Sequence, residues 1–118
     1  MKITEKTISR FTRLLLERMA GKYGGDTTLN ELRVMNAVYF HSFSDELCTP
    51  TLLANTTDIP KSTVSRSLAS LIDKGWLRDE VDVEDRRRRI IKLSDKALER
   101  RGSDFQDCMD WLQESGEG

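Results

Sequence analysis

Four consecutive arginines, Arg86–Arg89, follow Asp85 in a chain of 118 residues whose formal net charge is only −1. Guanidinium groups bind carboxylate and phosphate oxygens through a rigid fork of N–H donors. Five carboxylates lie just before or at the start of the run, at Asp79, Glu80, Asp82, Glu84 and Asp85. The arginines are therefore expected either to neutralise these carboxylates or to bind an external polyanion.

The charge is unevenly distributed along the chain. Residues 60–93 contain nine basic and six acidic residues, whereas residues 94–118 contain three basic and seven acidic residues. A local basic segment within a nearly neutral chain favours a nucleic-acid site of limited size. The same balance argues against a protein that coats nucleic acid indiscriminately.

Apolar residues at helical spacing predict a long helix at each end of the chain. Ile8, Phe11 and Leu15 recur at intervals of three and four residues, which predicts a helix over residues 3–22. A second run of apolar residues at the same spacing predicts a helix over residues 94–112. The length of the chain favours one domain, residues 1–118, that contains both helices.

Three further helix starts are predicted between these ends. The T-x-x-E pattern of Thr28–Glu31 has the form of a capping box. Thr49 is a predicted cap for a short helix with Pro50 at its first position. Pro60 opens the next helix, which is expected to end at Gly75. Two short helices joined by a tight turn predict a helix-turn-helix.

A β-hairpin with a charged tip is predicted after the helix-turn-helix. Its strands are the short β-prone runs at residues 76–77 and 90–93, which flank an aspartate-rich stretch. Side chains alternate along a strand, so we expect Arg87 and Arg89 to share one face of the hairpin. Arg86 and Arg88 would then share the other face, and the four arginines could not all contact one partner.

Two motifs in the middle of the chain are similar to those of a known family. The stretch PKSTVSRSLASLIDKGWL followed by DVEDRRRRIIKLS resembles the MarR family of bacterial transcription regulators, over roughly residues 28–98. The family pattern is carried by Lys74-Gly75, by the wing motif Asp85-Arg86-Arg87, and by Leu93-Ser94. Residues 59–64 also resemble the recognition helix of the IclR family, but the wing motif and the terminal helices favour MarR.

The resemblance implies a fold that is mainly α with a small β-hairpin (α+β). It would be a winged helix-turn-helix over residues 28–93 with extra N- and C-terminal helices for dimerisation. Members of the family are homodimers whose first and last helices pack across a two-fold axis. The implied interface residues in this chain are Ile8, Phe11, Leu15, Phe105, Met109 and Leu112.

The resemblance also implies contacts with double-stranded DNA. A recognition helix at about residues 60–74 would enter the major groove, and a wing at about residues 79–90 would enter the minor groove, which attracts arginine where it is narrow. The expected DNA contacts are Lys61, Ser62, Thr63, Ser65, Arg66, Ser70, Arg86, Arg87 and Arg88. The resemblance gives Asp85 the role of orienting Arg87.

Regulation by a small molecule or by oxidation is also considered. The resemblance implies an effector pocket between the helix-turn-helix and the dimerisation helices. The aromatic residues available to line it are Tyr39, Phe40, Phe43 and Trp76, although such residues are more often plain core. The two cysteines, Cys48 and Cys108, are expected to be free thiols that either sense oxidants or act as inert apolar residues. The single histidine, His41, is predicted to lie in a loop.

The sequence therefore predicts a dimeric, sequence-specific DNA-binding regulator of transcription. The alternative is a winged-helix module whose basic wing docks an acidic protein partner. An enzyme is disfavoured because the chain has one histidine and no pattern of catalytic, metal-binding or cofactor-binding residues. We expect no membrane contact and a cytoplasmic location, because the chain begins without a secretory signal and lacks an apolar run of membrane-spanning length.

Overall fold

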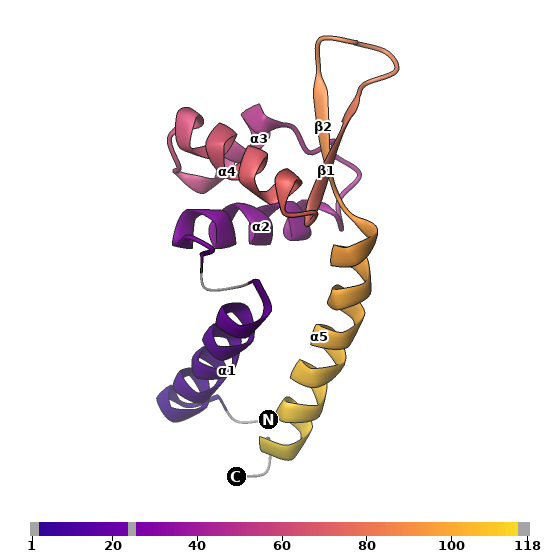
Figure 1. Ribbon diagram of the computed structural model, residues 1–118. Helices are drawn as coiled ribbons and strands as arrows, with labels where there is room; N and C mark the ends of the chain where they lie inside the picture. Colours follow the sequence, from indigo (N-terminus) through magenta and orange to yellow (C-terminus); the bar gives the residue numbers. More distant parts are fainter. Residues whose placement is uncertain (1–2, 24–25, 116–118) are drawn as a thin grey trace. The chain divides into compact units, whose positions relative to one another are not determined.

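The computed structural model describes residues 3–23 and 26–115, and its chain forms two compact units. One unit joins residues 1–27 to residues 100–118, and the other comprises Thr28–Glu99. The order of elements is α1, α2, α3, α4, β1, β2, α5, so the predicted fold class, mainly α with one hairpin, is confirmed (Figure 1). The second unit begins at the predicted start of the winged helix-turn-helix and extends six residues beyond its predicted end at residue 93.

The first unit contains helix α1, Glu5–Tyr23, and most of helix α5, Asp95–Ser115. The rings of Phe11 and Trp111 lie 5.7 Å apart, and Arg18 Nη1 lies 2.7 Å from Asp107 Oδ2. These contacts join the two helices within the unit.

The predicted interface residues fall on this unit. Ile8 is 57% exposed, whereas Phe11, Leu15 and Met109 are half-buried. The side chains of Phe105 and Leu112 lie outside the described residues. Partial exposure of apolar side chains is compatible with the predicted subunit contact, which stays a prediction.

Helix α2, Leu29–His41, starts with the predicted capping box. The Glu31 backbone N–H donates to Thr28 Oγ1 at 3.1 Å, and Glu31 Oε2 accepts from the Thr28 backbone N–H at 2.7 Å. Val34, Met35 and Val38 are buried in the core of the second unit. His41 is the last residue of this helix, so its placement in a loop was wrong: the helix continues one residue beyond the predicted boundary.

Helices α3, Pro50–Thr57, and α4, Lys61–Asp73, form the helix-turn-helix. Thr49 Oγ1 caps α3 by accepting from the Leu52 backbone N–H at 3.1 Å. The turn passes through Asp58 in the left-handed conformation, with φ of 58°, which aspartate tolerates better than most residues. Helix α4 buries Val64, Leu68 and Leu71, and the chain reverses after it at Gly75, with φ of 83°.

Strands β1, Leu77–Val81, and β2, Arg89–Leu93, form an antiparallel hairpin that projects beyond the helices of the second unit (Figure 1). Its register pairs Leu77 with Leu93 and Val81 with Arg89. The Ile91 backbone N–H donates to the Cys48 carbonyl at 2.8 Å, which ties the segment before α3 to β2. Residues 82–88 form the tip of the wing and are not extended, so the expected alternation of Arg86, Arg87 and Arg88 between two faces was wrong.

Candidate nucleic-acid interface

The outer face of α4 presents small hydroxyl residues and two cations. Burial of the apolar stripe turns Lys61, Ser62, Ser65 and Arg66 to the exposed side, with Thr63 half-buried beside them. Arg66 Nη2 donates to Thr63 Oγ1 at 3.3 Å, and neither Lys61 nor Arg66 forms an ion pair with any residue that the structure describes. This face can approach a flat or grooved polyanion closely, because its side chains are short around one long cation.

Ser70 stands apart from the other predicted contacts on α4. It is half-buried, and its hydroxyl donates to Glu31 Oε1. Lys74 Nζ reaches the same oxygen at 3.1 Å. Sequence reasoning missed this cluster because Glu31 was interpreted only as the fourth residue of the capping box. An acidic residue on the same face of the helix as its buried apolar residues was the available signal.

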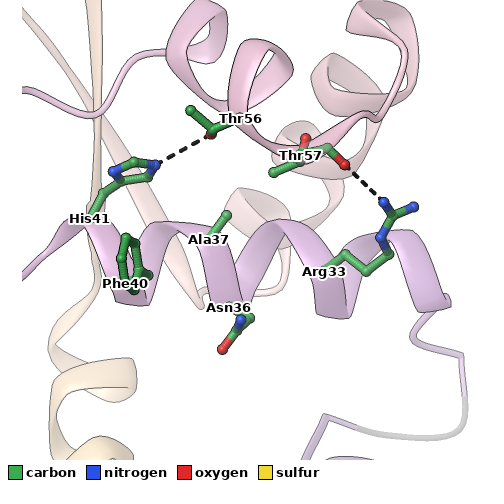
Figure 2. A pocket seen from close by; sticks show the side chains of 7 residues that line it. All are labelled: Arg33, Asn36, Ala37, Phe40, His41, Thr56 and Thr57. Atoms are coloured by element: carbon green, nitrogen blue, oxygen red, sulfur yellow. Dashed lines mark hydrogen bonds between the residues drawn. The ribbon is translucent and has the colours of Figure 1, made fainter.

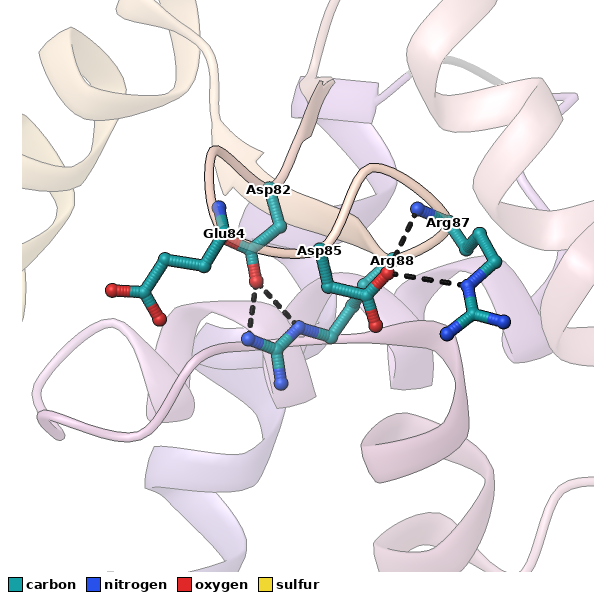
Figure 3. Close-up of polar contacts among 5 residues, drawn as sticks. All are labelled: Asp82, Glu84, Asp85, Arg87 and Arg88. Atoms are coloured by element: carbon teal, nitrogen blue, oxygen red, sulfur yellow. Dashed lines mark hydrogen bonds and ion pairs between the residues drawn. The ribbon is translucent and has the colours of Figure 1, made fainter.

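The tip of the wing is closed by Asp82 and Arg88. Asp82 is 6% exposed, and its Oδ2 accepts from Arg88 Nε at 2.7 Å and also from Arg88 Nη2 (Figure 3). The Arg88 guanidinium, assisted by the Glu84 backbone N–H, holds the pKa of Asp82 below its usual value. Backbone bonds between residues 82 and 88 and between Arg88 and Asp85 complete the loop, at 3.0 and 2.9 Å.

Arg87 and Asp85 form a second, exposed pair at the tip (Figure 3). Asp85 Oδ1 accepts from the Arg87 backbone N–H at 3.1 Å and lies 3.5 Å from Arg87 Nε. The Arg87 side chain is 94% exposed. The carboxylate thus holds the base of an arginine whose guanidinium faces solvent, and the orienting role expected for Asp85 stays a prediction.

The four arginines differ in how closely they are engaged by the carboxylates of the wing. Arg88 pairs with Asp82, and Arg89 Nη2 lies 2.8 Å from Asp79 Oδ2. Arg86 is exposed and forms no ion pair within the described part of the chain. Arg86 and Arg87 therefore point outward at the tip. Lys61 and Arg66 on α4 are also exposed, so α4 and the wing tip carry four cations that take no part in the pairs with Asp79 and Asp82.

The sequence of this chain matches the model of a known protein family. The MarR family model matches residues 26–88, which is more than half of the chain and spans α2, the helix-turn-helix and the tip of the wing. The chain belongs to the MarR family. This confirms the resemblance that the wing motif and the K-G pair carried. No curated protein matches the chain.

Solved structures of MarR-family regulators share the fold. The complex of MepR from S. aureus with DNA has a TM-score of 0.69 and 20% identity, and the match covers 95% of this chain and 86% of that one. MepR bound to ethidium bromide has a TM-score of 0.63 at 21% identity, covering 96% and 80%. A mutant of MarR from E. coli complexed with operator DNA has a TM-score of 0.59 at 20% identity, covering 88% and 66%. At these identities the likeness establishes the winged-helix fold.

In this MarR-family chain a shallow hollow of about 400 Å³ lies between α2 and the end of α3 (Figure 2). It is bridged at two places, by Arg33 Nη2 donating to the Thr57 carbonyl at 2.8 Å and by His41 Nε2 lying 3.4 Å from Thr56 Oγ1. The lining residues are Arg33, Asn36, Ala37, Phe40, His41, Thr56 and Thr57. Phe40 is the one aromatic residue of the predicted effector pocket that lines it.

The other three aromatic residues lie elsewhere in the second unit. Trp76 is 5% exposed and belongs to the core, under Lys96 Nζ at 3.9 Å from the ring centre. Tyr39 packs edge-on against the exposed ring of Phe43 at 5.2 Å. The plain core interpretation therefore holds for Trp76.

Cys48 is buried, and burial raises the pKa of its thiol to about 11. The reactive thiolate is then almost absent at neutral pH, which argues against oxidant sensing at this residue. Cys108 is half-buried. Among the described residues, no group of three His, Cys, Asp or Glu side chains is arranged to hold a metal, and none of the described helices is both long and apolar enough to span a membrane.

Proposed function

We propose that this MarR-family protein is a sequence-specific, double-stranded DNA-binding regulator of transcription that acts in the cytoplasm as a homodimer, without catalytic activity. The observation that carries the proposal is the exposure of four cations, Lys61 and Arg66 on α4 and Arg86 and Arg87 at the wing tip. Both elements belong to one compact unit and lie on the same side of α2 (Figure 1). The DNA complexes of MepR and MarR, which share the fold, support it.

In this proposal α4 enters the major groove. Arg66 is the long donor that can fork onto a guanine edge, and Ser62, Thr63 and Ser65 allow close approach and bond to phosphates or bases. Lys61 lies at the start of the helix, where the backbone N–H groups also favour a phosphate. The helix therefore combines one base-reading cation with one positioning cation.

The wing enters the minor groove through Arg87, aimed by Asp85, while Arg86 contacts the adjacent phosphates. Arg88 was also expected to touch DNA, but its guanidinium is engaged by buried Asp82. We therefore give Arg88 a different role, which is to hold the wing loop closed. This division assigns the outward arginines to DNA and the inward one to the fold of the loop.

Dimerisation through α1 and α5 would place two such units on a near-palindromic operator. Ile8, Phe11, Leu15 and Met109 supply partly exposed apolar surface for that contact. MepR has been solved with bound ethidium bromide, and on that basis we propose that this chain also responds to a small-molecule effector.

The test is selection of bound fragments from a random pool of duplex DNA at about 0.15 M salt, where exposed charges further apart than about 8 Å are screened. Wild type is compared with the double variant Arg66→Ala, Arg87→Ala. A control with the same loss of charge carries Arg13→Ala and Arg100→Ala, two exposed arginines outside the second unit.

We expect wild type and the control to enrich a two-fold symmetric motif with half-sites about one helical turn apart, roughly 10 base pairs. The Arg66, Arg87 variant should lose that enrichment. If wild type enriches no motif, the protein is not an operator-binding regulator, and the acidic-partner module becomes the better account of the wing.

A further inference from the structure

The last turn of the recognition helix α4 is held from α2 by a buried carboxylate. Glu31 is 4% exposed, and its Oε1 accepts from the Ser70 hydroxyl and from Lys74 Nζ at 3.1 Å. Its Oε2 accepts from the Thr28 backbone N–H at 2.7 Å. One side chain therefore joins the start of α2 to two residues, one turn apart, at the end of α4.

The same end of α4 is held from the other side by the start of α5. Lys96 Nζ donates to the Lys74 carbonyl at 3.1 Å, and the Ser94 hydroxyl donates to the Gly75 carbonyl at 2.6 Å. The bond from Lys96 satisfies the carbonyl of the residue that caps α4, and the bond from Ser94 holds the glycine that follows it. The end of α4 is thus clamped between α2 and α5 by side chains.

Both clamping segments lie next to the points where the chain passes between its two compact units. The chain enters the second unit at Thr28, whose backbone N–H donates to the Glu31 carboxylate. It leaves the unit after Glu99, within α5. Because α5 is one continuous helix from Asp95, Lys96 is part of the element that leads out of the unit. The covalent connections in both directions therefore begin beside the end of the recognition helix.

We propose that Glu31, with Ser70 and Lys74, positions the recognition helix, so that its rotation about its own axis is fixed for reading DNA. This inference rests on the proposed function, and it gives Ser70 a role inside the protein instead of at a base edge. Glu31 touches no DNA in this scheme and is a positioning residue.

The geometry makes a small rotation consequential. Ser70 lies four residues after Arg66 and so on the same side of α4, one turn away. A helix with side chains has a radius of roughly 5–6 Å, so a rotation of about 10° would move the end of a side chain by about 1 Å. Precise recognition tolerates displacements of only about 0.5 Å. A bond that fixes the rotation of α4 at Ser70 therefore also fixes the direction in which the Arg66 side chain points.

The buried charge opposes such a rotation. If Ser70 turned away, the Glu31 carboxylate would lose a donor while still out of contact with water, which is costly for an ionised group. Burial by itself would raise the pKa of Glu31, but the bonds from Ser70, Thr28 and Lys74 outweigh it and lower the pKa to about 2. The carboxylate therefore remains ionised throughout the range in which DNA binding would be measured.

A double-mutant cycle tests the proposal on the operator recovered by the selection above. Glu31→Gln keeps the size of the side chain and an acceptor for Thr28, and Ser70→Ala removes the hydroxyl of α4. The two variants, their combination and wild type are compared for Kd on the operator and on a scrambled duplex. Val38→Ala is the control, since it creates a cavity in α2 at a site 2% exposed with no side-chain polar group. All binding is measured where circular dichroism shows each variant to be folded.

We expect Glu31→Gln and Ser70→Ala each to reduce the ratio of operator to scrambled affinity by about tenfold, similar to the loss of one good base contact. In the double variant this ratio should fall no further than in either single variant, because both substitutions remove the same Glu31–Ser70 hydrogen bond. Val38→Ala should keep the ratio of wild type.

Additive losses from Glu31→Gln and Ser70→Ala, or a loss from Ser70→Ala alone, would overturn the proposal and return Ser70 to direct DNA contact. A ratio for Glu31→Gln equal to that of Val38→Ala would also overturn it. In each of these cases wild type still binds its operator, whereas failure of the proposed function would leave no operator to measure.

Discussion

The Glu31 carboxylate should make a pH-dependent contribution to stability that can be isolated by one substitution. Its pKa is lowered from 4.5 to about 2 in the folded chain. A carboxylate with a lowered folded pKa stabilises the protein above its unfolded pKa, and this stability is lost as the pH falls through the folded value. The relevant window therefore lies between about pH 4.5 and pH 2.

Glu31→Gln resembles the protonated acid in shape and charge, so it should remove this contribution at neutral pH. A shift from 4.5 to about 2 corresponds to about 3 kcal/mol at pH 7, at roughly 1.4 kcal/mol for each pKa unit. By the same linkage the contribution falls to about 1 kcal/mol at pH 3 and to less than about 0.5 kcal/mol at pH 2. Solvent screening reduces these values little, because the side chain is 6% exposed.

The assay is urea unfolding followed by circular dichroism at pH 7, 5, 4 and 3, with wild type and Glu31→Gln at one fixed protein concentration, since oligomerisation alters apparent stability. We expect the difference in unfolding free energy to narrow by about 2 kcal/mol between pH 7 and pH 3. Other carboxylates titrate in both proteins and cancel in the difference. The loss in Val38→Ala arises from a cavity and should not depend on pH.

A difference that is the same at every pH would refute the reasoning, because the loss would then come from altered packing and not from the charge. Equal stability of wild type and Glu31→Gln at pH 7 would refute it as well. In that case the desolvation of Glu31 would match the gain from its three donors, as happens in many buried ion pairs.

Three further outcomes are expected. Cys48 should react slowly with a thiol reagent at pH 8 in a native Cys108→Ser variant and quickly in urea; fast native labelling would contradict its burial. Leu15→Asp should sediment as a monomer at micromolar concentration and bind DNA poorly, and a wild-type monomer at that concentration would remove the dimer. The two cations assigned to phosphates, Lys61 and Arg86, in each of two protomers, at about 0.9 per phosphate contact, give a slope of log K against log salt of about −4. A slope near −7 would mean that two further cations in each protomer, such as Arg88 and Arg89, also bind phosphates.

Local features of the fold were predictable from the sequence because their causes are local. The capping box at Thr28–Glu31 and the cap at Thr49 each depend on residues within four positions of one another. The same is true of the apolar stripe of α4. The stripe fixes which side of α4 faces outward, and so the exposure of Ser62, Ser65 and Arg66 was predictable.

The contact between Glu31 and Ser70 was not predictable in the same way, because 39 residues separate its partners. The spacing of apolar residues in α2 does not indicate which helix will pack against its N-terminal turn. The polar residue was visible at a core position, and burial of an acid demands a donor. The identity of that donor depends on how α2 and α4 pack, which only the folded chain specifies.

The wing shows a different reason for error. Its arginines were placed on a strand because the runs on both sides are β-prone, and alternation was then applied to residues 86–88. Asp82 and Asp85 instead bond to backbone N–H groups two residues ahead, at 3.0 Å for Glu84 and 3.1 Å for Arg87. Such side-chain bonds compete with strand pairing and favour a turn.

The acidic residues of the wing therefore build its charge pattern and do not merely reduce its charge. Asp82 fixes Arg88 and closes the loop, and Asp85 holds the base of the neighbouring arginine while leaving its guanidinium exposed. A wing with the same arginines and no aspartates would carry more charge, but its loop would lack these bonds. Specific recognition requires placement more than total charge, because phosphate attraction alone carries no sequence information. The nearly neutral composition of this chain is thus compatible with sequence-specific DNA binding, in which two of the four arginines, Arg88 and Arg89, pair with carboxylates of the wing.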